Sequence, residues 1–183
     1  MKKNGFMAVL ATLAVLLSTL WPGWRGTGEA NGNTPRSVTH QRDTLRGLGG
    51  VHVLVEELEA DVEQHGLTAE ALQADTEEQL RRAGIDVLAE EQRLQTPGTP
   101  YLYVNVNVSL GEETPLAAAT LDVALKQSVV LARDPIRLCL APTWRTGTTG
   151  RVGYARLADL RGAVNDLVAE FVEDYRAANP ATH

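Results

Sequence analysis

The ten residues Tyr101–Leu110, YLYVNVNVSL, decide the fold class of this chain. Apolar residues alternate here with polar or aromatic ones, and this period of two is typical of a β-strand with one buried face. Leucine and valine fill the face expected to be buried, whereas the other face carries Tyr101, Tyr103, Asn105 and Asn107. Because that second face is polar, we expect it to stay open to solvent.

Two further alternating stretches follow this strand, one at 120–132 and one at 136–146. Short turns connect all three, and long strands joined by short turns indicate an antiparallel meander. Gln127 interrupts the apolar file of the first stretch. The interruption predicts either a β-bulge that shifts the register or a buried hydrogen-bond partner for this amide group.

The last stretch contains the residues Trp144 and Cys139. Trp144 lies in phase with Leu138 and Leu140, which predicts an indole in the core. The alternative is a partly exposed aromatic anchor at a binding edge, beside Arg145. Cys139 is the only cysteine of the chain. Its place in a strand favours a buried thiol over one that pairs with another chain.

A β-α-β unit precedes the meander. Its first strand is expected at 51–58 and its helix at 69–83, with Thr68 as the N-cap and Gly84 just beyond the C-terminus. A short strand at 85–89 completes the unit.

The chain closes with an amphipathic helix expected at 158–178, whose apolar residues recur at three- and four-residue spacing. The predicted order is therefore β-α-β-β-β-β-α. This order predicts an α+β fold, a two-layer sandwich in which both helices cover one face of a mixed, mostly antiparallel sheet of about five strands.

The N-terminal residues 1–30 have the pattern of an export signal, in which two lysines precede an almost unbroken apolar run. The run of roughly 15 residues is short for a bilayer-spanning helix of about 20. We therefore expect a cleaved signal peptide and a periplasmic or secreted protein; the alternative is an N-terminal membrane anchor. Residues 31–46 are polar and aperiodic and predict a flexible tether, followed by one domain at 47–180.

Composition and charge restrict the partners. Hydrophobic residues make up 44% of the 183 residues, and the formal net charge is −6. Removal of residues 1–30 takes away three basic residues and one acidic residue, which leaves −8. An acidic globular chain of this kind is not expected to bind nucleic acid or an anionic lipid surface. We expect no membrane span once the signal is removed.

No motif predicts an enzyme. The chain lacks the nucleophile elbow of α/β-hydrolases and the helical histidine pair of zinc proteases. The stretch Gly147–Gly153 has the spacing of neither phosphate-binding fingerprint, so it predicts a glycine-rich turn. Arg145 and Arg151 beside it leave a small anion site as a minority hypothesis. His52 and His65 flank an acidic stretch without metal-ligand spacing, and we expect no metal and no cofactor.

Short sequence features give a resemblance over roughly residues 47–180. The chain resembles uncharacterised exported bacterial α+β domains in Gly66-Leu67-Thr68, in Thr143-Trp144 followed by Gly147 and Gly150, and in Asn179-Pro180. The predicted element order is similar to that of the N-terminal domain of the translocation protein TolB, although no β-propeller repeats follow it here. The resemblance implies an envelope location and an interaction role, and it transfers no functional residue.

The sequence therefore predicts a soluble, non-catalytic domain that binds another envelope component through its open sheet face or edge. The candidate contact residues are Tyr101, Tyr103, Asn105, Asn107, Trp144, Arg145 and Arg151. Two alternatives stay open: a small-molecule or lipid carrier with its ligand between the sheet and the last helix, and a hydrolase without a recognisable motif. The identity of the partner and the oligomeric state do not follow from the sequence.

Overall fold

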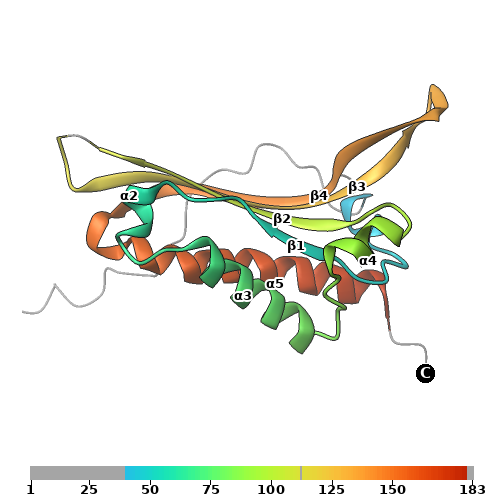
Figure 1. Cartoon of the computed structure of the whole chain (residues 1–183), viewed down its shortest axis with the longest axis horizontal. Coiled ribbons are helices and arrows are strands. Elements are labelled where there is room, and N and C mark those ends of the chain that lie inside the picture. Colours follow the sequence, from blue (N-terminus) through green and yellow to red (C-terminus); the bar gives the residue numbers. More distant parts are fainter. Residues whose placement is uncertain (1–39, 112, 181–183) are drawn as a thin grey trace, which may run out of the picture.

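A computed structural model describes residues 40–111 and 113–180. Their α+β fold places a four-stranded sheet above a layer of helices (Figure 1). The elements are, in order, β1 (His52–Val55), α2 (Ala60–Glu63), α3 (Ala69–Arg82), α4 (Glu90–Gln95), β2 (Tyr101–Leu110), β3 (Leu116–Leu131), β4 (Asp134–Gly153), the 3-10 helix η1 (Tyr154–Asp159) and α5 (Leu160–Ala178). The predicted α+β class is confirmed, with four strands in place of about five.

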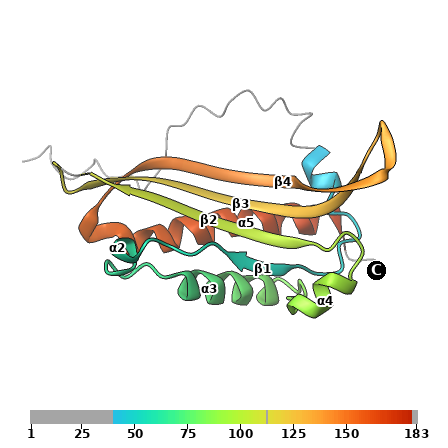
Figure 2. The same cartoon turned by 45° about the horizontal axis from the view of Figure 1, so that its top comes forward.

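The strands lie in the order β1-β2-β3-β4 (Figure 2). β1 pairs with β2 in parallel, and β2, β3 and β4 form the predicted antiparallel meander. The strand expected at 85–89 is reduced to a single bridge between Val51 and Val87. Two backbone hydrogen bonds hold this segment to Val51 before α4 begins at Glu90. The chain therefore leaves the sheet too soon to form a fifth strand.

The glycine-rich stretch Gly147–Gly153 is strand rather than the predicted turn, and it pairs with β3 from Leu116 to Asp122. A Cβ atom at Gly147 would lie 2.7 Å from the carbonyl oxygen of Leu121. Glycine here permits the two backbones to approach closely, which is a recognised role of glycine in a strand.

α3 and α5 cover one face of the sheet, and their ends follow the sequence signals. The Thr68 side chain accepts a hydrogen bond from the Ala71 amide at 3.2 Å, and Gly84 has a φ of +77°, as predicted. The core between the layers holds side chains that are at most 1% exposed, among them Leu72, Leu80, Leu102, Leu121, Leu125, Val164, Val168 and Phe171.

The fold begins before the predicted boundary at residue 47. Residues 40–43 form a helical turn, and Leu45 is fully buried in the core. The Asn179 side chain bonds the Gly47 amide at 2.7 Å and the Leu45 carbonyl at 2.8 Å. Residues 40–46 are therefore part of the domain and not of a tether, because Leu45 is buried in the core and its carbonyl bonds Asn179, directly after α5, while Arg42 pairs with Asp174 of α5. The predictions for residues 1–39 lie outside the described residues.

The hairpin of β3 and β4 continues past the sheet as an arm, residues 126–142, which rises on the side away from the helices (Figure 1). Leu138 and Leu140, predicted to lie in the core, are 69% and 55% exposed there, and Cys139 is half-buried instead of buried. The register shifts directly after Leu125, at the point where the arm begins. β2 extends only to Tyr101, opposite Lys126, so the arm lacks the neighbouring strand that the body of the sheet has.

Candidate functional site

The open face is the side of the sheet that neither α3 nor α5 covers. Alternation along β2 places Tyr101, Tyr103, Asn105 and Asn107 on it. The register adds two residues of β4. Arg145 lies opposite Ala124, which pairs with Tyr103 on its other side, and Arg151 lies opposite Ala118. Six of the seven candidate residues thus share one face.

Trp144 is the exception, because it belongs to the core. Its side chain is 3% exposed and meets the ring of Phe171 edge-on, with 5.1 Å between the ring centroids. The indole Nε1 donates a hydrogen bond to Asp174 Oδ2 at 2.9 Å. The alternation of the sequence predicts this position, and the alternative of an exposed anchor does not hold.

Cations cover the two tyrosine rings of the open face. Lys126 Nζ lies 3.3 Å from the ring centroid of Tyr103, and Arg93 Cζ lies 5.4 Å from that of Tyr101. The Tyr103 hydroxyl donates a hydrogen bond to Glu56. Cation–π contacts of this kind hold the rings in place. The tyrosines therefore form part of a polar, charged surface and are not bare stacking platforms.

Charge pairs fix the side chains in the middle and at one end of the open face. Arg145 Nε donates to Asp122 Oδ1 at 2.5 Å; the Asp122 side chain is 17% exposed and that of Arg145 is 65% exposed. Near α4, the hydrogen bond from Arg93 holds the pKa of Glu90 below its usual range, and Glu90 in turn raises the pKa of Arg93. Both groups therefore stay charged at neutral pH. Arg151 is exposed and has no ion-pair partner among the described residues.

β4 forms one edge of the sheet, and its outward backbone groups can be assigned from the register. The Arg145 amide points away from β3, because it donates to Gln41 Oε1 at 3.1 Å. In an antiparallel strand every second amide points the same way, so the amides of Gly147, Thr149 and Arg151 also face outward. No backbone hydrogen bond from another described element reaches them. The edge is therefore open to a further strand.

The region expected to hold a carried ligand is filled. Between the sheet and α5 lie the side chains of Leu121, Val168 and Phe171, each at most 1% exposed. One surface hollow of about 410 Å³ is lined by Arg81, Gln92 and the segment 84–88. A second, of about 220 Å³, lies between the acidic segment after β1 and the outer part of β2. Neither hollow is lined by α5.

The histidines do not combine into a metal centre. His52 Nδ1 lies 3.0 Å from the Leu88 carbonyl oxygen, whereas the His65 ring packs against Tyr154 at a centroid distance of 5.6 Å. In the described parts of the chain no three His, Cys, Asp or Glu side chains are placed to hold a metal ion. No helix there is both long and apolar enough to span a membrane.

Sequence reasoning missed Lys126, Asp122 and Arg93 on or beside the open face. The sequence held a signal for Lys126 and Asp122. Pairing β2 with β3 residue by residue from their connecting turn places them opposite Tyr101 and Asn105, and paired residues of antiparallel strands share a face. Arg93 gave no such signal, because it comes from α4, a short helix of low hydrophobicity that was not predicted. Comparisons of this chain with protein-family models, curated proteins and solved structures find no match.

Proposed function

We propose that this chain is a non-catalytic domain of the cell envelope that binds another envelope component. The partner contributes an extended segment that pairs with the outer edge of β4 and contacts the adjoining part of the open face. The observation that carries the proposal is the row of unpartnered outward amides at Gly147, Thr149 and Arg151. Strand addition of this kind supplies main-chain hydrogen bonds for affinity, and neighbouring side chains supply specificity.

The composition of this edge supports the proposal. Proteins commonly block exposed edge strands with proline, lysine, bulges or a covering element. The segment 147–153, GTTGRVG, contains neither proline nor lysine, and its register with β3 is regular. The edge therefore has the features of a strand that accepts a partner.

The side chains beside the edge indicate which segment it takes. Arg151 has no ion-pair partner among the described residues, and Arg145 is largely exposed although it bonds Asp122. Both project from the open face next to the unpaired backbone. An acidic residue on the added strand would pair with Arg151 without displacing an existing contact. The location in the envelope is an expectation from the pattern of residues 1–30.

The test is capture of partners from the cell envelope by the full chain, read by native mass spectrometry. Thr149→Pro removes one outward amide and no backbone hydrogen bond to β3, because the Thr149 amide faces away from that strand. It also removes the contact of 3.2 Å between the hydroxyls of Thr149 and Thr120 on β3, which the control variant Thr149→Val removes as well. We expect at least a tenfold loss of capture. Thr149→Val is the matched control, since it keeps the amide and changes only the side chain, and it should capture normally.

The same experiment has outcomes that overturn the proposal. Unchanged capture by a folded Thr149→Pro variant would move the contact away from this edge. A bound small molecule without a protein would favour the carrier hypothesis. Turnover of a substrate in a broad screen would favour the hydrolase.

A further inference from the structure

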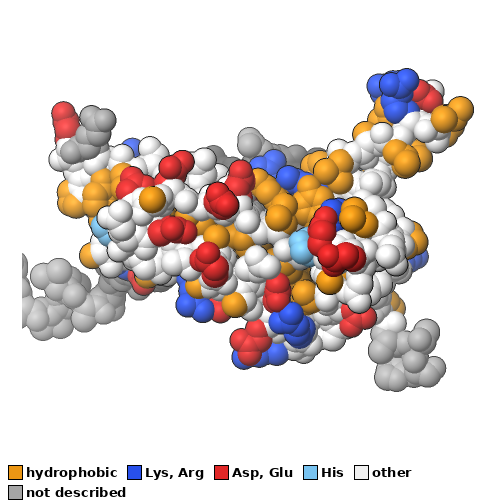
Figure 3. Space-filling view, viewed as in Figure 1, with side chains coloured by type: hydrophobic (Ala, Val, Ile, Leu, Met, Phe, Trp, Pro, Cys, Tyr) orange, Lys and Arg blue, Asp and Glu red, His pale blue; other side chains and the backbone are white. Residues whose placement is uncertain are grey.

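The arm, residues 126–142, concentrates the exposed apolar surface of the described chain. Its large apolar side chains are exposed by 55% at Val130, 93% at Ile136, 69% at Leu138 and 55% at Leu140. Figure 3 shows apolar side chains below a basic tip that stands clear of the body. A cluster of this kind is typical of an interaction site and not of free solvent-exposed strand.

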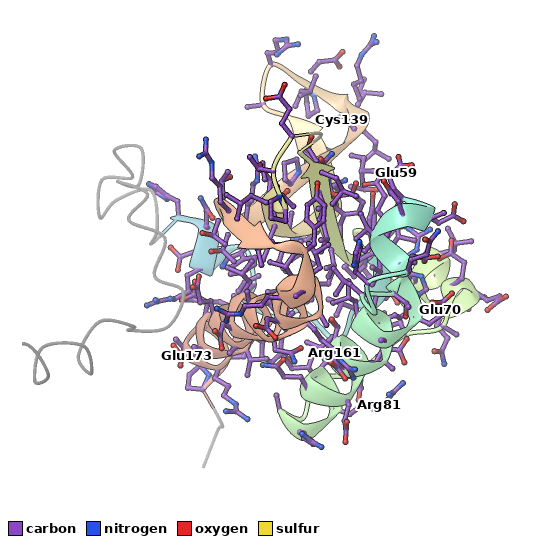
Figure 4. The ribbon with its side chains drawn as sticks, turned by 90° about the vertical axis from the view of Figure 1, so that its left-hand side faces the viewer. Glu59, Glu70, Arg81, Cys139, Arg161 and Glu173 are labelled. Atoms are coloured by element: carbon purple, nitrogen blue, oxygen red, sulfur yellow. The ribbon has the colours of Figure 1, made fainter. Side chains whose placement is uncertain are left out.

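No described part of the chain covers the arm. Figure 4, viewed along the long axis, places Cys139 of the arm above the sheet, and Glu173 and Arg161 of α5 below it. Beyond Lys126 the body contacts the arm at its base, where the Ser128 amide donates to the Gly98 carbonyl at 2.7 Å. A two-stranded ribbon is only marginally stable in water by itself. We therefore expect another surface to pack on it.

The tip of the arm is basic in an acidic chain. Arg133 and Arg137 flank the turn, and the only nearby carboxylate, Asp134, pairs with Arg137 at 3.1 Å. The tip thus carries one net positive charge, whereas the whole chain carries a formal charge of −6. A surface that fits the arm would offer acidic side chains to the tip and accessible apolar groups to the ribbon.

Such a surface lies at the other end of the sheet. β1 ends at Val55, so the outer edge of β2 has no neighbouring strand from Asn105 onward. The hollow of about 220 Å³ lies along this edge. The exposed carboxylates of Glu56, Glu57 and Glu59 make most of its accessible lining polar, and the half-buried Leu58 and Val108 add apolar groups, whereas Val62 and Val106 are buried beneath them. We call this region the acidic end.

We infer that the arm binds the acidic end of a second copy of this chain. Within one chain the two surfaces cannot meet, because the arm and α2 lie at opposite ends of the sheet in both views (Figures 1 and 2). A two-fold axis perpendicular to the long axis of the molecule would place the arm of each copy against the acidic end of the other. Both contacts then form in one closed dimer. This inference goes beyond the proposed function, since it uses neither the β4 edge nor Arg151.

Charge favours a second copy over a lipid bilayer. Anionic lipids attract a basic tip but repel a chain with this overall charge. The acidic end, by contrast, offers carboxylates beside apolar groups, which match both features of the arm. The chain itself therefore contains the complementary pair of surfaces.

The first experiment measures the mass of the purified full chain over a range of concentrations by sedimentation equilibrium. We expect a dimer whose dissociation constant rises at least tenfold in the double variant Ile136→Gln/Leu138→Gln. Leu94→Gln is the matched control, because Leu94 is 60% exposed on α4, and it should leave the dimer unchanged. A monomer at every concentration, or an unaffected double variant, would overturn the inference.

A charge exchange tests the contact itself. Arg133→Glu/Arg137→Glu and Glu57→Arg/Glu59→Arg should each weaken the dimer. An equimolar mixture of the two variants should form a heterodimer, because one of its two contacts is the wild-type pair and the other is the same pair with both charges reversed. Failure of the mixture to associate would contradict the pairing of arm and acidic end.

Two further outcomes assign the surfaces differently. A monomer that sediments with phosphatidylglycerol vesicles, and loses this property with Ile136→Gln/Leu138→Gln, would assign the arm to lipid. Loss of the dimer in Thr149→Pro would assign self-association to the β4 edge. Neither result on the dimer decides whether an envelope partner binds that edge, so the two proposals fail separately.

Discussion

β3 and β4 run through both the body of the sheet and the arm, but their apolar side chains are buried in the body and exposed in the arm. In the body, Leu121, Leu125 and Trp144 are at most 3% exposed. In the arm, Leu138 and Leu140 are more than half exposed, and the register shift after Leu125 turns them to the face opposite that of Trp144. Two features cause the difference: α5 packs on the core face of the body, and the bulge turns Leu138 and Leu140 to the other face, on which no described element packs. Alternation thus predicts a strand, and burial depends on what lies against it.

The largest expected effect comes from one leucine in each region. Leu167→Ala removes a side chain that α5 buries against the sheet, where it is 6% exposed, and should cost about 2–5 kcal/mol of unfolding free energy. Leu138→Ala on the arm should cost less than about 0.5 kcal/mol in dilute protein. Urea denaturation measures both.

The leucine pair has two informative failures. A loss below about 1 kcal/mol at Leu167 would mean that another face of α5 covers the sheet. A large loss at Leu138 that grows with protein concentration would show a covered arm, as the second copy predicts.

Within the body, substitutions on the two faces of β4 should differ in their cost to stability, by less than the two leucines do. Trp144→Phe keeps an aromatic ring against Phe171 but removes the donor to Asp174, which also pairs with Arg42 at 2.5 Å. We expect a loss of about 1–3 kcal/mol from the missing hydrogen bond and the smaller ring. Arg145→Gln, one residue further on the open face, should stay within about 0.5 kcal/mol. Equal losses in thermal or urea denaturation would mean that the two faces are not distinct.

The junction between body and arm gives the next prediction. Gln127 Nε2 donates to Thr143 Oγ1 at 2.7 Å, directly beside the register shift. Gln127→Ala should cost about 0.5–1.5 kcal/mol and speed hydrogen exchange at the base of the arm. Thr143→Val should have the same effect, and the double variant should add little, since both remove one contact. Additive losses would show that the bond does not hold the junction.

The junction also shows where sequence reasoning stops. The interruption at Gln127 offered a bulge or a hydrogen-bond partner, and the structure has both. The sequence pattern contained no sign that the strands would leave the core there. Leu138 and Leu140 were predicted to lie in the core because they are in phase with Trp144 in the sequence, but the bulge between Pro142 and Trp144 reverses the face that this period marks. The period also carries no information on the end of β2 at Tyr101. Likewise the single valine and leucine of 31–46 gave no periodic signal, although Leu45 is fully buried.

Local sequence patterns predicted correctly the features that depend on a single helix or strand. The bounds of β2, the Thr68 cap and the position of Gly84 each depend on a few neighbouring residues, and all are confirmed. For the open face, alternation placed the β2 residues correctly relative to one another. The contacts that fix them come from elsewhere, from Lys126 on β3 and Arg93 on α4, and their positions depend on tertiary packing.

The smallest expected effect is a pH dependence confined to the body. Asp75 of α3 accepts hydrogen bonds from Arg161 of α5, and this contact lowers the pKa of the carboxyl group. The unfolded chain therefore takes up the proton first as the pH falls. The stability from this pair is present above the ordinary carboxyl pKa of about 4 and is lost as the pH falls through the folded value. Asp75→Asn should be less stable at neutral pH and should lose less stability in acid.

Urea denaturation at a series of pH values between neutral and acid measures this difference, and Arg161→Gln is the matched variant. Both substitutions break the same link between α3 and α5, so both should flatten the acid slope. Hydrogen exchange adds the comparison of regions. In acid, the protection from exchange, taken relative to the intrinsic rate at each pH, should fall in α3 and α5 of the wild-type chain and stay constant in the arm, which this link does not touch. An equal acid slope in the wild type and Asp75→Asn would show that the pair does not couple the covering helices.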